Sequence, residues 1–247
     1  MTSLGILAFS PHPDDAEIGC GGSLLLARGR GMKTAIADLS QGECASRGGQ
    51  ELRDKEKKQA GRLLGLSRRF SLDLPDTRIG FDPDHRLAVI ELIRAQRPRL
   101  VLAPYGLDRH PDHEAAGRLV REACFYAGVP AVGQGTPFRP ERLYSYMIHT
   151  PFLPSFIVDI TEVWNRKMAV IKAYGSQFNS RRKGLKETAL SRPEFLKSQE
   201  ARAVYFGSMI GAGYGEPFFS QGPIPLRHLP GLDFPPPQGN LPPYTSF

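Results

Sequence analysis

Two short segments carry most of the side chains in this sequence that could do chemistry. Pro11–Asp15 supplies one histidine and two adjacent carboxylates directly after the apolar run Leu4–Phe9. His110–His113 supplies two histidines and a carboxylate just after a second apolar run, Leu100–Ala103. Because each segment follows a predicted buried strand, both are expected at the carboxyl edge of a parallel sheet, where open α/β sheets bind their ligands. Together they predict one metal site.

The residue types within these segments divide into metal ligands and a base. A catalytic zinc site commonly has three histidine or carboxylate ligands and one position open to water. His12, Asp15 and His113 form such a set. Asp14 adjoins a ligand without being one, so it is placed to accept a proton from the reacting water. The set predicts metal-assisted hydrolysis of an amide, and it would accept Fe²⁺, Mn²⁺ or Co²⁺ as well as zinc.

The second segment leaves one histidine and one carboxylate for the rest of the reaction. A protonated His110 could stabilise an oxyanion or protonate a leaving amine. Asp112, as a nearby carboxylate, would orient that ring and raise its pKa. The remaining histidines have no partner motif and are predicted to be surface or core residues: His85, His149 and His228.

The sequence around the two segments alternates strand-like and helix-like stretches. The predicted strands are Leu4–Phe9, Lys33–Leu39, Arg69–Leu72, Arg99–Ala103, Leu143–Met147 and Ser155–Ile160. The predicted helices are Ala16–Arg30, Gln50–Leu64, Pro83–Gln96, Asp112–Tyr126, Glu162–Tyr174 and Pro193–Phe206. This order predicts an α/β, Rossmann-like fold with a mostly parallel sheet flanked by helices. We expect a single α/β domain over residues 1–222 and a proline-rich C-terminal tail over 223–247.

Composition limits the class of protein. No apolar run approaches the roughly 18 residues that a membrane span needs, and the first residues lack the basic region of a signal peptide. The three cysteines are widely spaced without a CxxC pair, which disfavours a disulfide framework or a thiolate zinc site. We therefore expect a cytoplasmic protein without a membrane partner. Cys44 is of interest because its loop is predicted to border the site.

The net charge of +7 has one origin, the segment from Arg166 to Arg202, with ten basic and three acidic residues. A solvated helical face explains this segment, and an electrostatic guide for an anionic small substrate is the alternative. Nucleic-acid binding is disfavoured because basic and aromatic residues do not interleave and no zinc finger is present. A non-catalytic nucleotide-binding module is a distant alternative, since Gly19, Gly21 and Gly22 fall within a predicted helix and do not match G-x-G-x-x-G.

The segments Pro11–Gly22 and His110–His113 resemble the two motifs of the PIG-L/LmbE-like zinc-dependent N-deacetylases, which act on glucosamine conjugates. The similarity continues to Tyr174–Phe178 and Tyr214–Phe218 and resembles the bacillithiol-biosynthesis branch of that family. The resemblance implies a Rossmann-like fold and a homo-oligomer such as a hexamer. It implies zinc held by the three ligands above, Asp14 as general base, and His110, with Asp112 behind it, assisting the oxyanion and the leaving amine.

The branch also implies a substrate, N-acetyl-α-D-glucosaminyl L-malate. Malate carries two carboxylates, which planar guanidinium groups bind well. Arg53, Arg109 and Arg47 are the candidates to bind them. The alternative within the family is a deacetylase of another N-acetylglucosamine conjugate or of a chito-oligosaccharide.

Overall fold

The computed structural model describes residues 3–178 and 187–226. The predicted tail therefore lies outside the described residues except for 223–226, and so does His228. Part of the basic segment, residues 179–186, lies outside them as well.

A seven-stranded sheet in the order β3-β2-β1-β4-β5-β7-β6 forms the centre of the described chain. The strands are β1 (Ile6–Ser10), β2 (Thr34–Asp38), β3 (Arg68–Ser71), β4 (Leu100–Pro104), β5 (Arg142–Tyr146), β6 (Phe156–Asp159) and β7 (Gly215–Phe219). Strands β1 to β5 pair in parallel, and β7 runs antiparallel to both of its neighbours. The expectation of an α/β fold with a mostly parallel sheet is confirmed.

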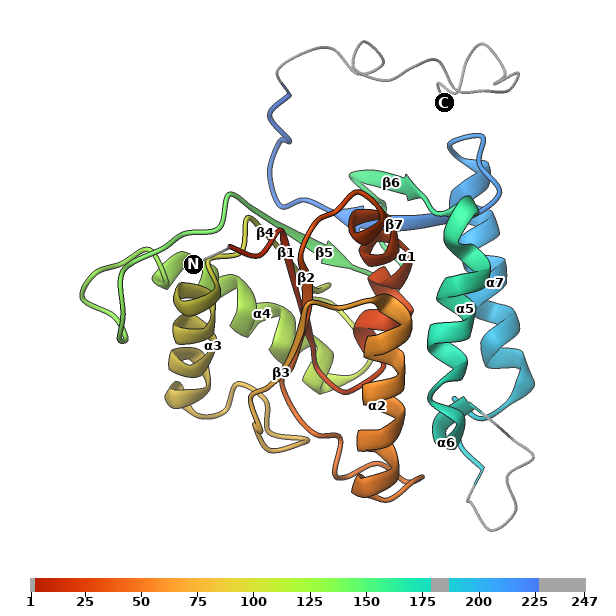
Figure 1. Ribbon diagram of the computed structural model, residues 1–247, viewed down its shortest axis with the longest axis horizontal. Coiled ribbons are helices and arrows are strands. Elements are labelled where there is room, and N and C mark those ends of the chain that lie inside the picture. The colour runs from red at the N-terminus through yellow and green to blue at the C-terminus, as the bar shows by residue number, and fades with distance from the viewer. Residues whose placement is uncertain (1–2, 179–186, 227–247) are drawn as a thin grey trace.

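Helices cover both faces of this sheet (Figure 1). They are α1 (Asp15–Gly29), α2 (Gln50–Leu64), α3 (Pro83–Gln96), α4 (Pro111–Tyr126), α5 (Trp164–Lys172), α6 (Gly175–Phe178) and α7 (Pro193–Ser208), with a 3₁₀ turn at Thr161–Val163. Helices α1, α2, α5 and α7 lie on one side of the sheet, and α3 and α4 lie on the other (Figure 1). None of the helices in the described ranges is long and apolar enough to cross a membrane.

Strand β1 shows why the sheet has two apolar faces. Its side chains alternate between the faces: Ile6 and Ala8 join the core beneath α1 and α5, whereas Leu7 and Phe9 join the core beneath α3 and α4. A strand buried on both faces has a continuous apolar sequence, and this pattern is why β1 could be predicted.

The strand order brings two distant segments together. β1 pairs with β4, Ile6 opposite Leu100, although β2 and β3 come between them in the chain. The chain builds outward from β1 to one edge and then from β4 toward the other, so β1 and β4 flank the topological switch point. The segments that leave their carboxyl ends emerge side by side at the position where such sheets bind ligands.

Two elements were not predicted, α6 and β7. The sequence of β7 contains Pro217, a residue that is uncommon within sheets because it cannot donate a ladder hydrogen bond. The strand nevertheless pairs with β5 through Phe218 and Phe219 and with β6. The predicted helix Glu162–Tyr174 is split into the 3₁₀ turn and α5, and the other predicted boundaries agree within about two residues.

Candidate metal centre

Two helix N-termini place the candidate ligands. Helix α1 begins at Asp15, directly after Asp14, whose backbone has φ 120° and ψ −25°. Helix α4 begins at Pro111, whose fixed φ suits the first helical position. His110 caps α4, with its Nδ1 accepting the N–H of Asp112 at 3.2 Å. His113 therefore lies in the first turn of α4, facing the first turn of α1.

The predicted ligands converge on one carboxylate oxygen. Asp15 Oδ2 lies 3.1 Å from His12 Nδ1 and 3.3 Å from His113 Nε2. One ligand atom from each of the three residues lies within 4.8 Å of the others. Asp15 and His113 are buried, at 5% and 2% exposure. A closely spaced, buried set of two imidazoles and one carboxylate fits a catalytic zinc ion or a similar divalent metal.

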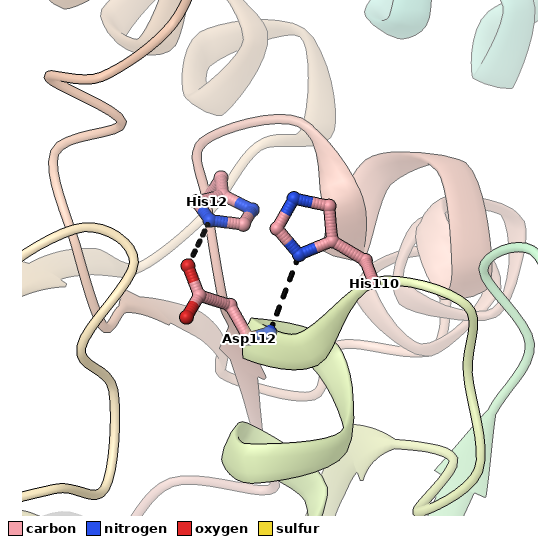
Figure 2. Close-up of side chains that lie close together, drawn as sticks. All are labelled: His12, His110 and Asp112. Atoms are coloured by element: carbon pink, nitrogen blue, oxygen red, sulfur yellow. Dashed lines mark hydrogen bonds and ion pairs between the residues drawn. The ribbon is translucent and has the colours of Figure 1, made fainter.

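The outward ring nitrogens of both ligand histidines face further carboxylates. His12 Nε2 lies 3.1 Å from Asp112 Oδ2 (Figure 2) and 3.2 Å from Asp76 Oδ1. His113 Nδ1 lies 3.2 Å from Asp108 Oδ1. Metal-binding histidines characteristically have a carboxylate or carbonyl at the second ring nitrogen, which fixes the ring and raises its basicity. The surroundings of both rings therefore match those of metal ligands.

The charge around the two rings is strongly negative. Although burial opposes protonation, the carboxylates hold the pKa of His12 well above its ordinary value and raise the pKa of His113 to about 9. Burial also disfavours the charged form of Asp15, yet His113 and His12 hold the pKa of this carboxyl well below its usual range. The centre thus favours positive charge, which a divalent cation would supply.

Asp14 has the environment of a general base. Its side chain is buried, and burial together with the neighbouring Asp15 raises the pKa of its carboxyl well above the usual range, while Arg53 opposes the shift. A raised pKa makes the ionised carboxylate a stronger proton acceptor. Positive φ is costly for a residue other than glycine, so the turn between β1 and α1 holds Asp14 in a strained conformation beside the ligands.

His110 differs from its expected state. Its ring centroid lies 5.0 Å from that of His12 and 4.6 Å from that of His113. Burial lowers its pKa, and the neighbouring histidines add to that shift, so the expectation of a raised pKa is corrected. Because Nδ1 accepts the N–H of Asp112 (Figure 2), the neutral ring carries its proton on Nε2.

Asp112 orients a different ring from the one expected. Its Oδ2 lies against His12 and also accepts the N–H of Thr77 at 2.9 Å. The backbone N–H of Asp112 donates to His110, whereas the carboxylate of Asp112 faces His12 (Figure 2). The expectation of a carboxylate behind His110 is therefore corrected: Asp112 supports a predicted ligand.

The three candidate arginines occupy different environments. Arg53 is buried and donates to the carbonyls of Gly42 and Pro13, both at 3.0 Å. Arg47 is also buried, and its Nε donates to the carbonyl of Ser176. Arg109 is exposed. Arg53 and Arg47 thus hold backbone segments near the centre, whereas Arg109 lies at the surface.

Sequence reasoning missed three residues of the site: Asp76, Asp108 and His149. His149, predicted to have no functional partner, stacks on His113 with ring centroids 5.1 Å apart. The backbone N–H of His149 donates to Asp108. All three residues lie in segments that follow parallel strands. A signal was therefore present, because segments at the carboxyl ends of parallel strands share one edge of the sheet.

Comparison with known proteins gives a consistent family. The family model described as "PIG-L: GlcNAc-PI de-N-acetylase" matches residues 7–124. The uncharacterized deacetylase YaiS of Escherichia coli is 32% identical over 126 residues, which are 49% of this chain and 68% of that protein. The diacetylchitobiose deacetylase of Thermococcus kodakarensis is 28% identical over 92% of this chain and 84% of its own length.

Two further proteins bear on substrate and fold. A Bacillus anthracis protein named as a probable N-acetyl-α-D-glucosaminyl L-malate deacetylase 2 is 26% identical over 70% of this chain and 81% of its own length. Among solved structures, a conserved protein of Thermus thermophilus, TT1542, is 41% identical, with a TM-score of 0.83 over 92% of this chain and 98% of that one.

Proposed function

This chain belongs to the PIG-L family of de-N-acetylases, and we propose that it is a zinc-dependent hydrolase that removes acetate from an N-acetylglucosamine conjugate. The observation that carries the proposal is the position of Asp15 Oδ2, 3.1 Å from a nitrogen of His12 and 3.3 Å from a nitrogen of His113. A carboxylate lies behind each of these rings, and Asp14 adjoins the set. These are the parts that hydrolysis of an amide requires.

The residues of this chain have distinct parts in the reaction. When bound, zinc supplies Lewis-acid chemistry, polarising a carbonyl and lowering the pKa of a water toward about 7. Asp14 accepts a proton from the water while the water oxygen bonds to the acetamide carbon. His110, with its proton on Nε2, donates a hydrogen bond to the oxygen on which negative charge develops.

The same two residues complete the cleavage. Asp14 then carries the proton that the leaving nitrogen needs, and it returns that proton as the carbon–nitrogen bond breaks. The products are acetate and the free amine. In this scheme His110 is less suited than Asp14 to give a proton to the amine, because its lowered pKa favours the neutral ring. The neutral ring still donates a hydrogen bond.

For the substrate we propose N-acetyl-α-D-glucosaminyl L-malate, the conjugate of the bacillithiol pathway. The Bacillus relative named for that conjugate supports the choice, as does the exposed guanidinium of Arg109 beside the second motif. The Thermococcus relative, named for diacetylchitobiose, supports the alternative of a chito-oligosaccharide. A cytoplasmic location and a homo-oligomer such as a hexamer belong to the same proposal, and light scattering of the purified protein tests the oligomer.

Acetate release from a small set of substrates tests the proposal. The protein is stripped with a chelator, reloaded with zinc, and offered N-acetylglucosaminyl-malate, diacetylchitobiose and free N-acetylglucosamine. We expect zinc-dependent release of acetate, with the highest kcat/KM for the malate conjugate. A higher kcat/KM for diacetylchitobiose would replace the substrate but keep the reaction. Absence of acetate from every substrate would contradict the reaction itself.

A further inference from the structure

A pocket of about 580 Å³ lies beside the metal centre, between the segment that follows β5 and helix α7. His149 lines it and stacks on the ligand His113. Arg109, which adjoins His110, lines it from the second motif. The pocket therefore adjoins the candidate metal site through His149 and Arg109 and extends along α7, where the part of a substrate that is not being deacetylated could lie.

The charge of this pocket has one sign. Its lining residues include two arginines, Arg109 and Arg202, and no aspartate or glutamate among the residues that the structure describes. The pocket is cationic, and the two guanidinium groups are the source.

Arg202 on α7 is a largely buried arginine without a carboxylate partner among the described residues. It is only partly exposed, and its guanidinium donates to the carbonyl of Ile148 at 2.6 Å and to Oε1 of Gln199. Within the described part of the chain it forms no ion pair with a carboxylate. Burial lowers its pKa to about 10, which reflects the cost of keeping a cation in this position.

The nearest acidic groups are engaged elsewhere. Glu216 accepts from the backbone of Gly22 and Ser23 and from Lys167 Nζ. Asp108 accepts from backbone N–H groups that include that of His149, and it faces His113. A desolvated cation without a paired anion is destabilising. A ligand that brings an anion to Arg202 would remove this cost.

We propose that this pocket is the subsite for the group attached to glucosamine and that it binds an anionic group, a carboxylate or a phosphate, through Arg202 and Arg109. The inference rests on the proposed function and extends it, because it assigns recognition of an acidic attached group to this pocket and to Arg202. Phe195 and Tyr205, which also line the pocket, supply apolar surface for the carbon skeleton. A neutral second sugar would leave Arg202 uncompensated, so the pocket favours an acidic conjugate over a chito-oligosaccharide.

Binding of deacetylated products to the zinc-loaded protein tests the subsite without turnover. The probes are glucosaminyl-malate, glucosamine 1-phosphate and the neutral methyl glucosaminide, measured by calorimetry. We expect at least one anionic probe to bind about 10- to 100-fold more tightly than the neutral one, the range for hydrogen bonds to charged groups. Whether malate or phosphate binds more tightly identifies the anion. Equal affinity for all three probes would overturn the proposal.

Variants assign the selectivity to the pocket. Arg202→Gln should reduce the preference for the anionic probe at least tenfold, and Arg202→Lys should restore part of it. Arg109→Gln, at an exposed position, gives a second test if Arg202→Gln fails to fold. Arg118→Gln is the charge-matched control, because its side chain is 76% exposed on α4 and pairs with Glu122. Parallel losses for anionic and neutral probes in both pocket variants would overturn the proposal.

Acetate release separates this inference from the proposed function. Tight, Arg202-dependent binding of an anionic product without acetate release from any conjugate would support the subsite and contradict the deacetylase. Release of acetate with equal kcat/KM from acidic and neutral conjugates would support the deacetylase and contradict the subsite.

Discussion

At the level of single residues, the carboxylates behind the ligand histidines define the centre as much as the ligands do. Asp112 and Asp76 face His12, and Asp108 faces His113. The candidate ligands and Asp14 lie in two compact segments of sequence, so they could be proposed from the sequence alone. The supporting carboxylates could not be assigned, because Asp76 comes from a third loop and because side-chain direction at the cap of α4 decides which ring Asp112 meets.

Asp108→Asn should weaken binding of the metal by about 10- to 100-fold, the usual effect of removing a carboxylate that supports a metal-binding histidine. Asparagine keeps one oxygen, which can accept the N–H groups of His149 and Thr150 that are now bonded to Oδ2. It loses the acceptor that faces His113 and the N–H of His110. The measurement is a chelator competition with zinc. Glu141→Gln, which changes the net charge equally at an exposed site, is the control. Equal zinc affinities of Asp108→Asn and the wild type would contradict this role.

The affinity for zinc should rise with pH over an unusually wide range. Metal ligation requires neutral imidazole, and His113 without metal has a pKa of about 9, compared with an ordinary value of 6.5. Below pH 9 zinc must therefore displace the proton on this ring, so the apparent affinity should increase up to about pH 9. Competition titrations between pH 6 and 9 at constant ionic strength check this. An affinity that is constant above pH 7 would show that His113 is not protonated there.

At the level of elements, helix α1 brings Asp15 to the site because it packs closely on the sheet. A Cβ on Gly19 would lie 2.1 Å from Cδ2 of Tyr146, a fully buried residue of β5 whose hydroxyl donates to the carbonyl of Phe9. The glycines of this helix were correctly predicted to lie within it. Their packing role could not be predicted, because the sequence does not show which side chain lies opposite each one.

Two glycines of α1 make a matched test of this packing. Gly19→Ala should destabilise the protein by about 1–3 kcal/mol, the typical cost of overpacking a core, because the methyl group meets the Tyr146 ring. Gly21→Ala should be neutral or stabilising by up to about 1 kcal/mol, since the nearest atom to its added Cβ is 3.8 Å away. Thermal and urea unfolding of both variants provide the measurement. Equal stability of the two would contradict close packing at Gly19.

At the level of the complete fold, the site follows from topology. Alternating apolar runs and helical periodicity were sufficient to predict the parallel sheet and its helices. They were also sufficient to place both motifs at strand ends. The strand order, which makes β1 and β4 neighbours, depends on long-range pairing that no local pattern encodes. The pairing of β7 with β5 and β6 is also long-range, and it overrides the local preference of Pro217. The pocket between α7 and the segment after β5 likewise depends on contacts between distant parts of the chain.

This topology places Asp14, the proposed proton acceptor, beside the proposed metal ligands, two histidines and one aspartate. Metal content and acetate release, measured on the same zinc-loaded samples of the wild type and of Asp14→Asn, are the decisive measurement of that arrangement. We expect stoichiometric zinc in both proteins and a loss of about 10²- to 10⁴-fold in kcat for Asp14→Asn, the usual contribution of a general base. Wild-type turnover in Asp14→Asn, with zinc bound, would refute the role of this carboxylate.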